Sequence, residues 1–145
     1  MNEVGSRRER TRARAWALQV LYRWETEGQG SPTAALRETL RSRRVAPSRR
    51  DHLVRLVNEV EDHLEEIDSN LRSVLENWRL DRLSVIDRSV LRIGAAELLR
   101  FDDVPPRVAI QEAVRLAGRY GGSESSRFVN GVLDALLHRQ VPDSP

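Results

Sequence analysis

Apolar side chains recur every three or four residues along most of the chain, and this spacing limits the fold more than any other feature of the sequence. No stretch sustains the alternation of apolar and polar residues that marks a half-buried strand. The clearest stripe comprises Ala13, Trp16, Ala17, Val20, Leu21 and Trp24. A stripe of this kind is the buried face of an amphipathic helix. The sequence therefore predicts an all-α fold.

Residues that favour helix ends divide the pattern into six or seven helices. Serine can cap a helix N-terminus, and Ser31, Ser48 and Ser84 each precede a helical pattern. The third stretch is longer than most globular helices, so we expect a break near residues 67–69, where Asp68 and Ser69 could cap a new start. The predicted helices are 8–27, 31–40, 48–78 with its break, 84–100, 106–117 and 124–138. Their short connections favour two small antiparallel bundles packed together.

The stretch 84–100 is apolar on almost all sides, which is typical of a central helix. Glu97 lies within it. We expect this carboxylate at the rim of the core, where it meets an arginine. The alternative is a buried glutamate, which would need a paired partner.

Three further positions carry expectations about packing. Trp16 and Val132 fall on apolar stripes and should lie in the core. Asn130-Gly131 would normally suggest a hairpin turn, but the helical spacing continues through it. We therefore expect Gly131 at a close helix crossing.

Composition and spacing argue against several classes of function. The chain has no cysteine, which excludes disulfides and thiolate sites and fits a reducing cytoplasm. Its three histidines are not spaced as metal ligands, and no serine stands in a nucleophile motif. No run of about 20 apolar residues could span a membrane. We expect no enzymatic activity, no cofactor, no metal and no membrane segment.

Charge is distributed unevenly along the chain. Residues 1–50 hold 12 arginines and 5 acidic residues, whereas residues 51–145 hold 12 arginines and 17 acidic residues. The front half is therefore basic and the back half acidic, which predicts two faces with different partners.

The arginines are densest before the first apolar stripe, in the segment 1–14. Five of them fall within eight residues, at Arg7, Arg8, Arg10, Arg12 and Arg14. Guanidinium groups match the geometry of phosphates, and arginine-rich segments often fold on RNA. A solvated, disordered N-terminus is the alternative. Composition alone does not decide between them.

Four motifs follow one another along most of the chain. The arginines lead into Ala17-Leu-Gln-Val-Leu-Tyr22, and Trp78-x-Leu-Asp-Arg-Leu83 comes later. Asp87-Arg-Ser-Val-Leu-Arg-Ile93 is next, and Ala109-Ile-Gln-Glu-Ala113 precedes Phe128-Val-Asn-Gly-Val-Leu133. In this order and spacing, residues 7–137 resemble the NusB family of transcription antitermination factors.

The resemblance implies one helical domain over 7–140, with subdomains at about 7–80 and 81–140. It also implies binding to boxA-type single-stranded RNA of ribosomal RNA leader transcripts. The expected protein partner is NusE, a small-subunit ribosomal protein. The RNA polymerase elongation complex and other Nus factors would be engaged through this heterodimer, in the cytoplasm, and a homodimer remains open.

The resemblance further implies roles for individual residues. The expected RNA-binding residues are Arg7, Arg8, Arg10, Arg14, Arg127 and Phe128. Tyr22 and Asp87 match positions at which the family binds its partner. Tyr22 lies one step off the first stripe, so its ring should be exposed.

Two other functions stay open at this stage. A helical protein-interaction module would account for the acidic back half and an exposed Tyr22. The same fold also occurs as an accessory RNA-binding domain of ribosomal RNA methyltransferases. Because no further domain follows in this sequence, a free-standing factor is the expectation.

Overall fold

The computed structural model describes residues 3–140, and of residues 3–5 only the backbone. Over this range it contains seven α-helices, one short 3₁₀ helix and no strand. The helices are α1 (Glu3–Glu27), α2 (Pro32–Ser42), α3 (Pro47–Asp62), α4 (Leu64–Val74), α5 (Val85–Arg100), α6 (Pro106–Gly121) and α7 (Ser123–Gln140), and the 3₁₀ helix η1 spans Leu80–Arg82. The all-α prediction and the helix count are confirmed.

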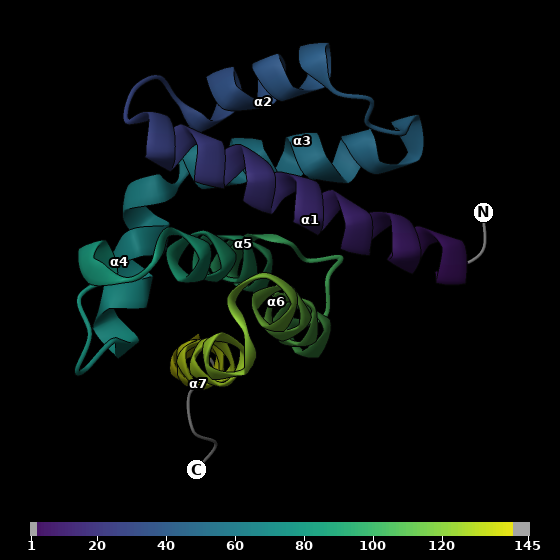
Figure 1. Cartoon of the computed structure of the whole chain (residues 1–145). Coiled ribbons are helices and arrows are strands. Elements are labelled where there is room, and N and C mark those ends of the chain that lie inside the picture. The colour runs from purple at the N-terminus through teal and green to yellow at the C-terminus, as the bar shows by residue number, and fades with distance from the viewer. Residues whose placement is uncertain (1–2, 141–145) are drawn as a thin grey trace.

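The helices form two groups that meet at α5 (Figure 1). The long helix α1 packs against α2, α3 and α5, and α2 packs on α3. On the other side, α6 and α7 pair closely, and both pack on α5. α5 thus occupies the centre, as expected for a helix that is apolar on almost all sides. Nine consecutive residues of it are buried, from Ser89 to Glu97.

Two of the three expected serine caps are present. The Ser31 hydroxyl accepts the Ala34 N–H at 3.1 Å, and the Ser84 hydroxyl accepts the Asp87 N–H at 3.1 Å. Ser48 is different, because α3 already begins at Pro47 and Ser48 donates to Glu9 at 2.8 Å. Its hydroxyl ties α3 to α1 instead of capping α3.

The long third stretch breaks earlier than the sequence predicts. The chain leaves helical geometry at His63, between α3 and α4, and not at residues 67–69. Asp68 is unavailable as a cap because it is buried and its two oxygens each accept a hydrogen bond from Arg92 at 2.9 Å. The Asp68 side chain, which could have capped a new helix, is therefore engaged in a long-range ion pair with Arg92 of α5.

Packing confirms one of the core expectations and corrects two. Val132 is buried, as predicted. Trp16 is only half-buried and packs at the edge of the core. Gly131 lies within α7, but a Cβ there would meet nothing within 4 Å, so it faces open space. The close crossing is at Gly94, where a Cβ would lie 2.6 Å from Leu133 Cδ1 and 3.1 Å from the Ala113 Cβ.

A largely buried ionic cluster joins α5 to α1 through Glu25 and to α4 through Asp68. Glu25 of α1 accepts hydrogen bonds from Arg88 at 2.7 Å and from Arg92 at 2.6 Å. Burial alone would raise the pKa of Glu25, but the two guanidinium groups outweigh it and lower that pKa. The charges are thus paired, as buried charges must be.

Within the described residues, no helix combines the length and apolar character needed to cross a membrane.

Candidate nucleic-acid interface

The arginine-rich segment belongs to α1. The helix begins at Glu3, so the cluster is helical and continuous with the first apolar stripe. Helical spacing then places Arg8, Arg12, Trp16 and Gln19 along one side of α1. The disordered N-terminus considered from composition does not describe residues 6–14.

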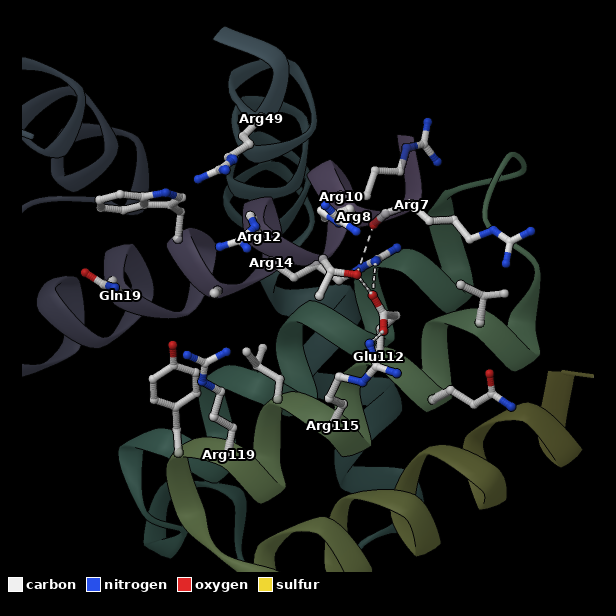
Figure 2. A pocket seen from close by; sticks show the side chains of 17 residues that line it. Arg7, Arg8, Arg10, Arg12, Arg14, Gln19, Arg49, Glu112, Arg115 and Arg119 are labelled. Carbon is white, nitrogen blue, oxygen red and sulfur yellow. Dashed lines mark hydrogen bonds and ion pairs between the residues drawn. The ribbon is translucent and has the colours of Figure 1, made fainter. Parts of the chain in front are cut away.

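This side of α1 faces α6 across an open groove of about 780 Å³ (Figure 2). We call it the α1–α6 groove. Its lining is Arg7, Arg8, Arg10, Thr11, Arg12, Arg14, Ala15, Trp16, Gln19, Arg49, Val108, Gln111, Glu112, Arg115, Leu116, Arg119 and Tyr120. It therefore brings the front of the chain together with a helix about 100 residues later.

The groove is strongly positive. Eight arginines line it, and Glu112 is the only acidic residue among its described lining residues. Arg8, Arg12 and Arg119 are exposed and form no ion pair within the described residues. These guanidinium groups are free to meet an anion, and dense positive charge in a concave surface attracts polyanions.

Glu112 is already bound by neighbouring side chains, so its negative charge is directed at them and not at the exposed arginines. It accepts a hydrogen bond from Thr11 and one from Arg14 at 2.8 Å, and it lies 3.5 Å from Arg115 (Figure 2). Thr11 and Arg14 belong to α1, and Glu112 belongs to α6. The carboxylate therefore links α1 to α6, the two helices that form the walls of the groove.

Arg14 has a different place from the one expected of an RNA-binding residue. It is 3% exposed, and its Nε lies 2.8 and 2.9 Å from the two carboxylate oxygens of Glu97. Its Nη1 donates to Glu112. The guanidinium is therefore engaged inside the protein through its Nε and Nη1, and these contacts hold α1 against α5 and α6.

Glu97 is likewise buried, so the alternative of a paired, buried glutamate is the one observed, and the rim placement was wrong. It is 1% exposed and also contacts His52 Nε2 at 2.6 Å. Burial would raise the pKa of Glu97, but the hydrogen bond from His52 and the charge of Arg14 outweigh burial and lower it. Burial also lowers the pKa of His52. The carboxylate is therefore charged, and neutral His52 donates its Nε2–H to it.

Arg10 is partly occupied as well. Its Nη2 donates to Asp103 at 2.8 Å, and Asp103 is also held by Arg55 at 2.7 Å. Hydrogen bonds from Arg55 and Arg10 lower the pKa of Asp103 far below its usual range. Arg10 is still part of the groove lining, but its single positive charge is paired with this carboxylate.

Aromatic rings and free amides accompany the arginines. Tyr120 is 41% exposed, with the Arg119 guanidinium 5.6 Å from its ring centroid. The side-chain amides of Gln19 and Gln111 are exposed on opposite walls, and neither makes a hydrogen bond to a described residue. Rings that stack and amides that hydrogen-bond are what recognition of unpaired bases requires.

The other expected site residues lie outside the groove. Phe128 is half-buried and packs edge-on against Trp78, with ring centroids 5.7 Å apart. Arg127 beside it is exposed, and neither residue lines the groove. Tyr22 is 44% exposed, as expected. Asp87 is half-buried, and its Oδ1 has no hydrogen-bond partner among the described residues.

Sequence reasoning missed the half of the groove that α6 supplies. A signal was present: Gln111, Arg115 and Arg119 are spaced by four residues and so lie on one face of α6. That face is opposite to the buried Ala113 and Ala117. Only the packing of α6 against α5 shows that it confronts α1. Within the described residues, no group of His, Cys, Asp and Glu could hold a metal ion.

Comparison with known proteins places this geometry in one family. The model of the NusB family matches residues 11–138. Transcription antitermination protein NusB of Anaeromyxobacter dehalogenans is 43% identical over 92% of this chain and 93% of its own length. The NusB of Chloroherpeton thalassium is 38% identical over 89% of this chain, which spans 61% of that longer protein.

Solved structures agree in fold. One solved structure, T. maritima NusB, has 35% sequence identity and a TM-score of 0.81, over 92% of this chain and 93% of that one. A crystal structure of antitermination factors NusB and NusE in complex with double-stranded RNA gives 32% identity and a TM-score of 0.80. That match covers 91% of this chain and 98% of that one.

Proposed function

Because the chain belongs to the NusB family, we propose that it is a transcription antitermination factor that binds RNA together with NusE. Its RNA is a boxA-type single strand from ribosomal RNA leader transcripts. The complex acts in the cytoplasm and helps RNA polymerase to elongate, with other Nus factors. The chain works by recruitment and not by catalysis.

The observation that carries this proposal is the α1–α6 groove. It joins unpaired guanidinium groups from both walls, at Arg8, Arg12 and Arg119, with the exposed ring of Tyr120. The arginines bind the phosphates, which supplies affinity but no sequence information. Tyr120 and the amide of Gln19 contact bases, which supplies preference for a sequence.

The expected RNA-binding residues divide into three groups. Arg7, Arg8 and Arg10 remain in the RNA-binding surface, since all three line the groove. Arg14 is a positioning residue, because its charge is consumed by Glu97 and Glu112. Arg127 and Phe128 lie elsewhere, so they would contact only RNA that leaves the groove.

Tyr22 and Asp87 form the proposed partner surface. The two helices that carry them are joined by the ion pair of Glu25 with Arg88, at 2.7 Å, which fixes α1 against the start of α5. The exposed ring of Tyr22 can anchor a partner. Asp87 forms no ion pair within the described residues, so its negative charge can attract a basic protein such as NusE. Gln19 and Tyr22 are three residues apart on α1, so RNA and partner would meet along this helix.

The test is fluorescence anisotropy of a labelled boxA-type RNA against a scrambled RNA of equal length, with and without NusE. We expect a preference for the boxA-type RNA that increases with NusE. Replacing Arg8, Arg12 and Arg119 by alanine should remove three phosphate contacts. The slope of log K against log salt should then become shallower by about 2, at roughly 0.7 per contact on single strands.

Arg72→Ala is the matched control, because Arg72 is an exposed arginine of α4 outside the groove. It should leave both affinity and slope unchanged. Equal binding of both RNAs without an effect of NusE would reduce the groove to a general polyanion site. The reading as a protein-interaction module would then be preferred.

A further inference from the structure

A second basic surface lies beside the groove, on α2 and its connection to α3. Residues 31–50 contain six arginines and a single acidic residue, Glu38. Glu38 is paired with Arg41. Arg43 and Arg44 are exposed and form no ion pair within the described residues. The motifs of the family do not include this segment, and the groove does not account for its charge.

The connection that carries these arginines is held in place. Val45 is 3% exposed and inserts into the core, and the Arg50 guanidinium donates to the Val45 carbonyl at 3.3 Å. A few residues later, Ser48 and Arg49 both bind Glu9 of α1 at 2.8 Å. Arg43 and Arg44 are therefore displayed from a fixed backbone.

Glu9 would be the natural acid to neutralise this surface, but it is already committed. Hydrogen bonds from Arg49 and Ser48 hold its carboxylate and lower its pKa. Glu38 and Glu9 are both engaged by other arginines, and neither Arg43 nor Arg44 forms an ion pair with a described residue. Two neighbouring arginines that are held on a fixed backbone and lack an acidic partner are suited to bind phosphate.

Trp16 connects this surface to the groove. The indole is part of the groove lining, and the Arg43 guanidinium lies over the same indole, 5.5 Å from the ring centroid. Arg49 follows this connection on α3 and also lines the groove. Arg43 therefore reaches the edge of the groove at Trp16, and Arg44 is its neighbour along the chain.

We propose that RNA bound in the α1–α6 groove continues over Trp16 and that Arg43 and Arg44 bind its phosphates outside the groove. Unpaired nucleotides stack on aromatic rings and on guanidinium planes, and the Trp16–Arg43 pair presents both. The inference rests on the proposed RNA binding in the groove. It adds a contact to nucleotides that flank the boxA-type element.

The experiment compares two RNAs on the full chain with NusE. One is a boxA-type RNA just long enough to fill the groove, and the other is the same RNA extended at either end by an unstructured uridine tract. The extended RNA should bind more tightly, and its log K against log salt should be steeper by about 1.4, for two added phosphate contacts. Arg43→Ala with Arg44→Ala should abolish both differences and leave binding of the short RNA unchanged.

Two controls separate charge from position. Arg43→Lys with Arg44→Lys keeps both charges and should retain the steeper slope, whereas Arg72→Ala should change nothing. Extended RNA that binds no better than short RNA would overturn the inference, as would an alanine variant that behaves like Arg72→Ala. In either case, tight binding of the short RNA would leave the groove itself intact as the RNA site. Failure of the unaltered chain to bind either RNA would overturn the proposed function, and the inference with it.

Discussion

Glu97 is the residue on which the placement of the arginine-bearing helix depends most. Its carboxylate is 1% exposed and meets Arg14 Nε at 2.8 Å and His52 Nε2 at 2.6 Å. Glu97→Gln keeps the size of the side chain and removes its charge. The Arg14 guanidinium would then be buried with one carboxylate fewer, and an amide N–H would face N–H donors.

The size of the effect follows from this geometry. Removing one partner of a buried ion pair costs about 3–5 kcal/mol, because the remaining charge is left uncompensated. Glu112 still holds Arg14 Nη1 at 2.8 Å, so we expect the lower end of that range. For a chain of this length, about 3 kcal/mol should lower Tm by roughly 10 °C.

Urea unfolding followed by far-UV circular dichroism would measure the loss. Glu65→Gln is the matched control, since Glu65 is an exposed glutamate of α4. A Glu97→Gln protein as stable as the control would refute the reasoning, because it would mean that the buried charge of Arg14 needs no partner. Arg14→Met with Glu97→Met removes both charges and should recover most of the lost stability.

The remaining predictions concern packing and pH. Val132→Asp buries an unpaired charge and should lower the free energy of unfolding by about 4 kcal/mol or more. Gly131→Ala, at the adjacent exposed position, should be neutral or raise it by up to about 1 kcal/mol; a marked loss in thermal unfolding of the alanine variant would show that α7 packs differently. Burial lowers the pKa of His52 below its ordinary 6.5, so below that pH the unfolded chain binds a proton that the folded chain does not. The unfolding free energy should therefore fall as the pH drops below 6.5, and further below 4.5, where the lowered pKa of Glu97 acts in the same direction. Chemical denaturation across this range should show a weaker fall near pH 6 in His52→Gln, and an unaltered pH profile would contradict the assignment of His52.

Much of the fold could be predicted because helices are decided over short distances along the chain. Apolar residues three and four apart marked the buried faces, and Ser31 and Ser84 marked helix starts, since a cap bonds within three residues of itself. Where prediction failed locally, a distant partner was responsible. Ser48 is drawn to Glu9 of α1, and Asp68 is drawn to Arg92 of α5.

The candidate site could be predicted only by half. The arginine cluster of α1 stands out in the sequence, and the family motifs attach RNA binding to it. The second wall does not, because Arg119 becomes part of a groove only when α6 packs on α5 and faces α1. For the same reason, sequence alone could not separate Arg14 from its neighbours.

The sequence by itself thus determined the helices, their buried faces, the basic front of the chain and its family. The tertiary structure alone decided which charges are available to a ligand. Arg14 and Glu97 are 83 residues apart, yet they neutralise each other inside the core. Arg8 and Arg12, on the same helix, are exposed and form no ion pair with any described residue. Composition cannot distinguish these arginines, because an ion pair depends on distance in space and not on position along the chain.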